Sequence, residues 1–347
     1  MRRGTQLGVT LLVVIAVTSA LSHGLVDWLG IRTGVVRHRV VGEGQPGPSA
    51  YLAGSSLLFD GLALDRVSKQ FGQGMETWFV AGSSPSEWEP FQSRAGAAKL
   101  TLIGISAYDL NEEFLCDFRS QVVSLPQAVK DLTAIQASWP LTKRVISQYP
   151  LKYVRFLFPT AGRSAGVMGG LKEQMGKVLK PWMKVESEAG PKVPTLGAGE
   201  VASEELERIS DWSAGTMLRW VTKMRSACHG KHSYDGLKKL AFLRMLQKAE
   251  QQGRVIVVVL PVSPAYSREF MTGQVPQEFE RALADAGKSA PKVQWVRLDQ
   301  VPALNSNENF WDLVHMNTYG RQAATDAFQA QCSTLEMEPL QARSSQP

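Results

Sequence analysis

Five short apolar runs, each bounded by small residues, constrain the fold of this chain most strongly. They are AYLAG near residue 50, ETWFVAG near residue 79, KLTLIGIS near residue 102, RVIVVVLPV near residue 257 and KVQWVRLD near residue 295. Continuous apolar runs of this length are typical of strands that are buried on both faces of a parallel sheet. Because such a sheet must be covered by helices on both sides, the pattern predicts an α/β protein.

Helical patterns separate these runs. LALDRVSKQFG follows the first run, DGLKKLAFLRMLQKAEQQG precedes the fourth, PQEFERALADAG precedes the fifth, and TYGRQAATDAFQAQC closes the domain. The second pattern ends at Gly253, and the third begins with Pro and ends with Gly, as helices often do. The alternation predicts a flavodoxin-like, doubly wound parallel sheet of about five strands within a domain spanning residues 49–334.

Residues 120–232 interrupt this alternation and contain no run that predicts a strand. Amphipathic pieces such as LPQAVKDLTAIQASW and SEELERISDWSAGTMLRWVTKMRSA flank a loop-like stretch, MKVESEAGPKVPTLGAGEVAS. We interpret residues 120–232 as a helical insertion that packs over one end of the sheet. Residues 335–347 are polar and are expected to form a disordered tail.

The N-terminal residues 1–30 are typical of a membrane anchor or a signal segment. MRR precedes an uncharged stretch from Gly4 to Val26 that is long enough to cross a bilayer. Basic residues before the stretch place the N-terminus in the cytoplasm and the main domain outside it. A cleaved signal peptide would give the same compartment, with a secreted product. Residues 31–48 are polar and rich in Gly and Pro, which indicates a linker.

Charge and cysteine usage limit the partners. The net charge of +6 suits an anionic partner such as a membrane surface or an acidic polymer. No nucleic acid partner is expected, because no basic helix is interleaved with aromatic residues. Cys116, Cys228 and Cys332 form no CxxC pair, so no zinc site is predicted; two of them could pair outside the cytoplasm, or all three could be buried thiols. We find no motif for a metal or an organic cofactor.

Small and polar residues follow the predicted strands at the ends where open parallel sheets bind ligands. Ser56 follows the first strand in a Gly-Ser-Ser sequence, and Asp312 lies three residues before His315 near the C-terminus. A serine hydroxyl becomes a nucleophile when a base removes its proton, and an acid can hold the base in the required tautomer. Ser56, His315 and Asp312 are therefore the candidate nucleophile, base and orienting acid.

An oxyanion formed by attack on a carbonyl needs hydrogen-bond donors. The backbone N–H groups of Ser56 and Gly82 can supply two, and the Ser106 side chain lies at the right strand end for a third. Structural alternatives remain open for each residue. Ser55 and Ser56 could cap a helix that starts near Leu58, His315 could be structural, and Asp312 could be a cap. We interpret Asp109 as a solvated carboxylate.

The order of these blocks resembles the SGNH, or GDSL-type, hydrolase superfamily over residues 49–118 and 234–330. GSSLL matches its first block with Ser56 as nucleophile, VAGSS matches the second with Gly82, and DLVH matches the last with Asp312 and His315. LPVSP after the fourth strand is also similar. The third block departs, because the family commonly has Gly-x-Asn-Asp where this chain has GISAYDLNE. Ser106 stands in the Asn position, and Asn111 lies further along.

The resemblance implies a membrane-anchored, extracytoplasmic serine esterase or O-acyltransferase that acts on acyl groups of a cell-envelope polysaccharide or exopolysaccharide. Proteins of that branch often work beside a membrane-bound O-acyltransferase. The missing Asn and the large insertion leave two alternatives, a catalytically impaired binding or assembly subunit and a secreted lipase or esterase. Trp88 and Trp311 are expected in packing roles, or as the walls of a sugar-binding site.

Overall fold

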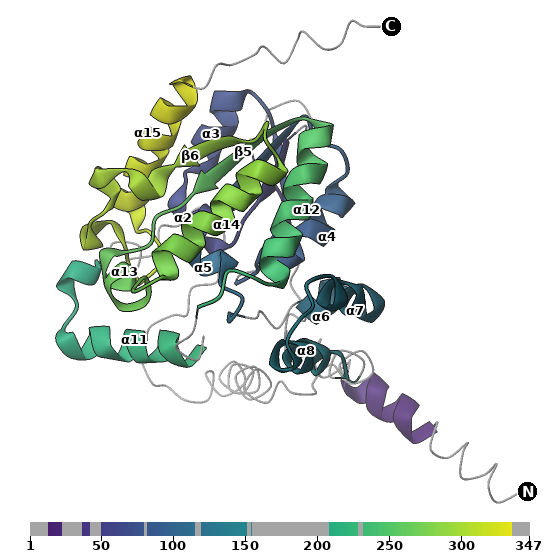
Figure 1. Cartoon of the computed structure of the whole chain (residues 1–347). Coiled ribbons are helices and arrows are strands. Elements are labelled where there is room, and N and C mark those ends of the chain that lie inside the picture. Colours follow the sequence, from purple (N-terminus) through teal and green to yellow (C-terminus); the bar gives the residue numbers. More distant parts are fainter. Residues whose placement is uncertain are drawn as a thin grey trace, which may run out of the picture. The chain divides into compact units, whose positions relative to one another are not determined.

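The computed structural model describes residues 13–22, 37–41, 50–79, 82–114, 119–150, 154, 208–227 and 232–334. The chain divides into two compact units. Residues Val36–Val122 and Gly199–Pro347 form the sheet unit, and residues Met1–Val35 and Val123–Ala198 form the other. Figure 1 shows the whole chain.

The sheet has six strands in the order β1-β3-β2-β4-β5-β6. These are β1 (Arg37–Val41), β2 (Ala50–Ala53), β3 (Met75–Phe79), β4 (Leu100–Ile105), β5 (Arg254–Val259) and β6 (Gln294–Arg297). Strands β2 to β6 pair in parallel, and their order is the order of flavodoxin-like sheets. The predicted α/β class and the five parallel strands are thereby confirmed.

Strand β1 was not predicted, and it lies inside the segment 31–48 that the sequence indicated as a linker. It pairs antiparallel with β3 at the edge of the sheet, from Arg37 opposite Phe79 to Val41 opposite Met75. An edge strand need not be apolar on both faces, so a search for continuous apolar runs does not detect RHRVV.

Helices cover both faces of the sheet (Figure 1). The described helices of this unit are α2 (Ser56–Gly61), α3 (Leu64–Phe71), α4 (Pro85–Ala95), α5 (Ala107–Leu110), α6 (Arg119–Val122), α11 (Ala214–Ala227), α12 (Leu237–Gln252), α13 (Pro264–Phe270), α14 (Val275–Ser289) and α15 (Thr318–Thr334). Short 3₁₀ turns are η2 (Ile209–Asp211), η3 (Leu298–Gln300), η4 (Pro302–Leu304) and η5 (Asn307–Asn309).

Two hydrophobic cores lie on opposite faces of the sheet. Alternate strand residues separate between them, so that Ala50 and Leu52 belong to one core and Tyr51 and Ala53 to the other. The first core is shared with α2, α3, α13 and α15, and the second with α4, α12 and α14. This burial of both strand faces is what the continuous apolar runs predict.

The described parts of the predicted insertion, residues 120–150, 154, 208–227 and 232, contain helices and no strand, as expected. In the other unit, α7 (Leu125–Ala134) and α8 (Trp139–Ile146) pack together, and the Tyr149 hydroxyl donates to the carbonyl oxygen of Val123 at 3.3 Å. In the sheet unit, Ile209 and Val221 enter the first core, which places η2 and α11 against the sheet's helices.

The predicted terminal segments are only partly described. Residues 13–22 are helical, and residues 335–347 lie outside the described residues. Within the described ranges, no helix combines the length and the apolar character that a bilayer crossing requires.

Leu58 of α2 sits directly on two glycines. A Cβ atom added at Gly54 would lie 2.5 Å from the Leu58 Cδ2, and one added at Gly104 would lie 2.6 Å from its Cδ1 and 2.8 Å from its Cβ. Real Cβ atoms do not approach carbon so closely, and the Leu58 Cβ is too near the backbone to move aside. The two glycines therefore let α2 descend onto the ends of β2 and β4.

Replacing Gly104 by Ala is expected to lower the free energy of unfolding by about 1–3 kcal/mol, because the new methyl group overpacks against Leu58. Chemical denaturation measures the change. Gly287→Ala in α14 is the matched control: its nearest neighbour is 3.7 Å away, and Ala is the better helix former, so stability should stay level or rise. Equal effects of the two substitutions would contradict the steric argument.

Candidate active site

Ser56, His315 and Asp312 form one hydrogen-bonded series. The Ser56 Oγ lies 2.8 Å from the His315 Nε2, across 259 residues of sequence. The His315 Nδ1 lies 2.8 Å from the Asp312 Oδ2. In the tautomer that carries its proton on Nδ1, His315 donates to Asp312 and accepts from the Ser56 hydroxyl. The structure thus brings together the three residues that the sequence singled out as nucleophile, base and orienting acid.

A short loop before α15 holds His315 in place. Phe310 and Met316 form an antiparallel bridge, and the Trp311 N–H donates to the His315 carbonyl oxygen at 3.1 Å. The Trp311 ring stacks on the imidazole, with 5.2 Å between ring centroids and 18° between planes. The Asp312 Oδ1 accepts from the backbone N–H groups of Val314 and His315 at 2.8 and 2.7 Å. These contacts fix both the acid and the ring.

The acid and the base shift each other's titration. Burial alone would raise the pKa of Asp312, but the charge and the hydrogen bonds of His315, together with the Val314 N–H, hold that pKa below its usual value. Burial alone would lower the pKa of His315, but the charge of Asp312 and its hydrogen bond raise it above the ordinary 6.5. The pair therefore favours an ionised Asp312 and an imidazole that is more basic than a free one.

Ser56 is the first residue of α2, and Ser55 is its N-cap. The Ser55 hydroxyl accepts from the Leu57 N–H at 3.2 Å, so Ser55 takes the capping role that was one alternative for both serines. The first N–H groups of a helix have no partner within it, so the Ser56 N–H is available at this end. The hydroxyl of Ser56 is left for His315.

Gly82 follows β3 with φ of +73°, a conformation that glycine adopts at no steric cost. It is exposed, and it lines a small cavity described below. The position at the end of the strand next to β2 agrees with its expected place beside the site.

Ser106 does not supply the oxyanion donor that the sequence indicated. Its side chain is fully buried and caps α5, and its hydroxyl donates to the Asp109 Oδ2 at 2.8 Å. Asn111, the alternative donor, is also fully buried. Its Oδ1 accepts from the backbone N–H groups of Ser233 and Glu113 at 3.1 and 3.2 Å. The prediction for Ser106 is therefore wrong, because its hydroxyl is committed to Asp109, whereas the donor role of the Asn111 amide N–H groups stays a prediction.

The two tryptophans have different places. Trp88 is 1 % exposed in the second core, and its indole N–H donates to the Ser83 hydroxyl at 2.9 Å, so it cannot contact a substrate. Its predicted role in a sugar site is wrong. Trp311 is half-buried beside His315 and remains a candidate for substrate contact.

A cavity of about 60 Å³ lies beside the strand ends, lined by Gly82, Ser83, Ser84, Tyr108, Asp109, Phe114 and Lys238. Asp109 is 2 % exposed, which corrects its interpretation as a solvated carboxylate. Burial raises its pKa to about 6, against the nearby hydroxyls of Ser55 and Ser106 and the charge of Lys238.

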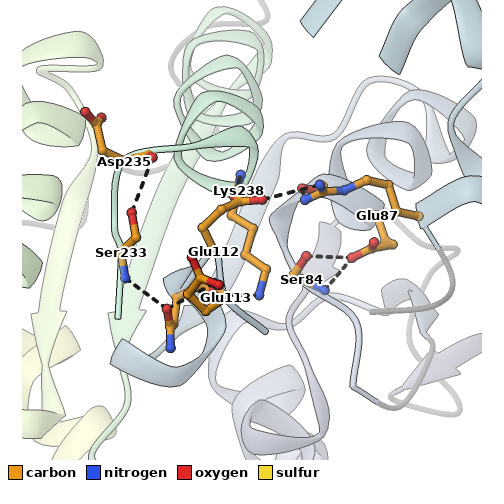
Figure 2. A network of polar contacts seen from close by, with 10 residues as sticks. Ser84, Glu87, Glu112, Glu113, Ser233, Asp235 and Lys238 are labelled. Atoms are coloured by element: carbon orange, nitrogen blue, oxygen red, sulfur yellow. Dashed lines mark hydrogen bonds and ion pairs between the residues drawn. The ribbon is translucent and has the colours of Figure 1, made fainter. Parts of the chain in front are cut away.

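Lys238, which lines the cavity, belongs to a buried group of charged side chains, drawn in part in Figure 2. The Lys238 ammonium donates to the Asn111 carbonyl oxygen at 2.7 Å, and burial lowers its pKa to about 8. Glu87 accepts from the N–H and the hydroxyl of Ser84, and burial raises its pKa. Glu112 and Arg119 complete the group with an ion pair at 3.4 Å. Sequence reasoning missed it entirely.

The described residues hold no group of three or more His, Cys, Asp or Glu side chains arranged to bind a metal ion. Cys332 is a buried free thiol, whereas Cys116 and Cys228 lie outside the described residues.

A scan against models of protein families finds none that matches this chain, and a search among curated proteins finds no similar one. The function must therefore be argued from the geometry. A hydroxyl on a hydrogen-bonded imidazole, backed by an ionised carboxylate, is suited to nucleophilic attack on a carbonyl carbon.

Asp312→Asn is expected to lower the pKa of His315 below 6.5, because it removes the charge that outweighs the effect of burial. NMR titration of the imidazole resonances measures the change. Asp326→Asn is the control, since Asp326 is exposed and pairs with Arg66. A His315 pKa that does not move in Asp312→Asn would refute the electrostatic coupling.

Proposed function

We propose that this protein is an SGNH-like serine esterase or O-acyltransferase. The observation that carries the proposal is the hydrogen-bonded series from Ser56 through His315 to Asp312, assembled at the carboxyl ends of a parallel sheet. Ligands of open α/β sheets bind at this edge. The sequence blocks that resemble the SGNH superfamily contain these same three residues. This supports an SGNH-like enzyme over other folds that carry a Ser-His-Asp series.

In the proposed reaction, the Ser56 Oγ attacks the acyl carbonyl carbon while its proton passes to the His315 Nε2. The carbonyl electron pair moves to the oxygen, where the N–H groups of Ser56 and Gly82 stabilise the charge. Collapse of this intermediate expels the leaving alcohol, which takes the proton from His315. An acyl group then remains on Ser56. Water or a sugar hydroxyl removes it by the same steps in reverse.

Asp312 acts on this reaction through His315. It keeps the imidazole proton on Nδ1, so that Nε2 is free to accept, and its charge stabilises the imidazolium that forms in each step. Stacking of Trp311 on the ring restricts rotation, which maintains the angle of the base toward Ser56.

The proposed substrate is an acylated cell-envelope polysaccharide or exopolysaccharide outside the cytoplasm, handled beside a membrane-bound O-acyltransferase. This part rests on the resemblance and on the basic start of the chain before its apolar stretch. We propose that the acyl group enters the cavity of about 60 Å³ that Gly82 borders, which would favour a short acyl group over a long chain. A catalytically impaired binding subunit is the second candidate, favoured by the occupied side chains of Ser106 and Asn111.

Ser56→Ala is expected to abolish covalent labelling of the full-length, detergent-purified chain by a fluorophosphonate, with a loss of about 10³-fold or more in rate. Ser124→Ala is the control, because Ser124 caps α7 and belongs to the other unit. Equal labelling of wild type and Ser56→Ala would refute the enzyme and favour the binding subunit.

Wild-type esterase activity on p-nitrophenyl esters is expected to fall as the acyl chain lengthens from acetyl to octanoyl, because the cavity beside Gly82 is small. The ratio of kcat/KM values measures the preference. A preference for octanoyl would contradict the short-acyl proposal and favour the lipase alternative.

A further inference from the structure

The Asp109 carboxyl lies between two strand ends of the proposed site. Asp109 is in α5, directly after β4, and its Oδ2 accepts from the Ser106 N–H at 2.9 Å and from the Ser106 hydroxyl at 2.8 Å. The side chain of Ser55, next to the nucleophile, is also near this carboxyl. The Asp109 carboxyl is thus one hydrogen bond beyond the hydroxyl that the sequence predicted as the third oxyanion donor.

The second carboxyl oxygen of Asp109 has no hydrogen-bond partner among the residues that the structure describes. Within the described part of the chain, Oδ1 is buried and unpaired. Asp109 and Gly82 line the same cavity. An unpaired polar atom in a buried position costs about 1–3 kcal/mol, so each such atom in a native structure calls for an explanation. A substrate oxygen in the cavity would supply the missing partner.

Burial and the neighbouring charges have opposite effects on the pKa of Asp109. Burial raises the pKa of this carboxyl to about 6, and the charge of Lys238 on α12 opposes the rise. Burial lowers the pKa of Lys238, the charges of Glu112 and Glu87 oppose that fall, and the charge of Arg119 adds to it. On the other side is His315, whose pKa is raised in part by the charge of Asp109. The proton of Asp109 is therefore held in the range where many enzymes work, and the group lies within electrostatic reach of the base.

We propose that Asp109, in its protonated form, is the third oxyanion donor of the site and hence a catalytic residue. The inference rests on the proposed function and deepens it, because it assigns the donor that the Ser106 hydroxyl does not supply. A carboxylic acid kept neutral by burial can donate a hydrogen bond to a developing oxyanion. Its Oδ2 stays bound to Ser106, and its Oδ1–H points to the substrate oxygen.

No bond to Asp109 breaks in this step. When the Ser56 Oγ adds to the carbonyl carbon, the electron pair moves to the oxygen and the hydrogen bond from Oδ1–H shortens. The proton remains on Asp109 and the bond relaxes when the carbonyl re-forms. An ionised Asp109 would instead repel the oxyanion. Because the reaction also needs a neutral His315, activity is expected to be highest between the pKa values of Asp109 and His315. It should fall at higher pH, where Asp109 is ionised, and at lower pH, where His315 is protonated.

The test compares pH profiles of kcat/KM for p-nitrophenyl acetate in wild type and Asp109→Asn, using the full-length chain in detergent. The amide is isosteric, accepts from Ser106 and donates at every pH. Wild type should show an acid limb from His315 and an alkaline limb from Asp109. In Asp109→Asn the alkaline limb should vanish. At pH 8, two units above a pKa of about 6, the variant should exceed wild type by about tenfold or more.

Asp326→Asn is the control, because it makes the same chemical change on an exposed carboxylate and should keep the wild-type profile. Asp109→Ala should lose about 10²–10³-fold at pH 6. Thermal unfolding of each variant separates loss of the donor from loss of the α5 cap. If Asp109→Ala does not fold, Asp109→Asn carries the test alone.

Two results would overturn the assignment of Asp109 alone: an alkaline limb that persists in Asp109→Asn, or a folded Asp109→Asn that is inactive at every pH. Absence of any Ser56-dependent turnover in wild type, at any pH, would instead overturn the proposed function together with the inference.

Discussion

The close packing of Leu58 on Gly54 and Gly104 is the constraint on which the rest of the site depends. Without a side chain at either glycine, the first turn of α2 can lie against the ends of β2 and β4. The nucleophile candidate and the N-terminal N–H groups of α2 are placed by the backbone in this way. The packing also keeps Ser55 beside Asp109, so that two neighbouring strand ends contribute to one small volume.

The C-terminal loop adds polar contacts to the packing of its Leu313 and Val314 in the first core, which also holds Leu58. One oxygen of Asp312 accepts hydrogen bonds from the backbone of its own loop, and the other accepts from the imidazole. The same carboxylate therefore fixes both the loop and the ring. Burial of Asp312 is tolerated because each of its oxygens is satisfied. The stability of the loop and the basicity of His315 therefore have a common origin in one buried, fully bonded acid.

The sequence predicted what depends on local spacing and on strands buried on both faces. Asp312 and His315 are three residues apart, so their contact follows from a turn, and the five apolar runs follow from double burial. It did not predict β1, whose pairing with β3 leaves no apolar signature, nor the fate of Ser106. The Ser106 side chain is shorter than the Asn that the resembled family commonly has at this position. Only the structure shows that the Ser106 hydroxyl donates to Asp109. A Ser-x-x-Asp sequence after a strand is a helix-capping signal, and it could have predicted the contact between Ser106 and Asp109.

The ends of the two strands that flank β2 carry this same capping pattern, and together they explain the buried charge. After β3, Ser84 is bound by Glu87, and after β4, Ser106 is bound by Asp109. Each acid bonds its serine with one oxygen and leaves the other unpaired within the described residues. The buried cluster holds three carboxyl groups, those of Glu87, Asp109 and Glu112, but only two positive charges, those of Lys238 and Arg119. Burial raises the pKa of both capping acids, Glu87 and Asp109. The cluster therefore favours keeping one of its carboxyl groups protonated, because its two positive charges balance only two carboxylates. Of the two capping acids, Asp109 is the one beside Ser55, so under the proposed function a proton held there is the one that a substrate at Ser56 would meet.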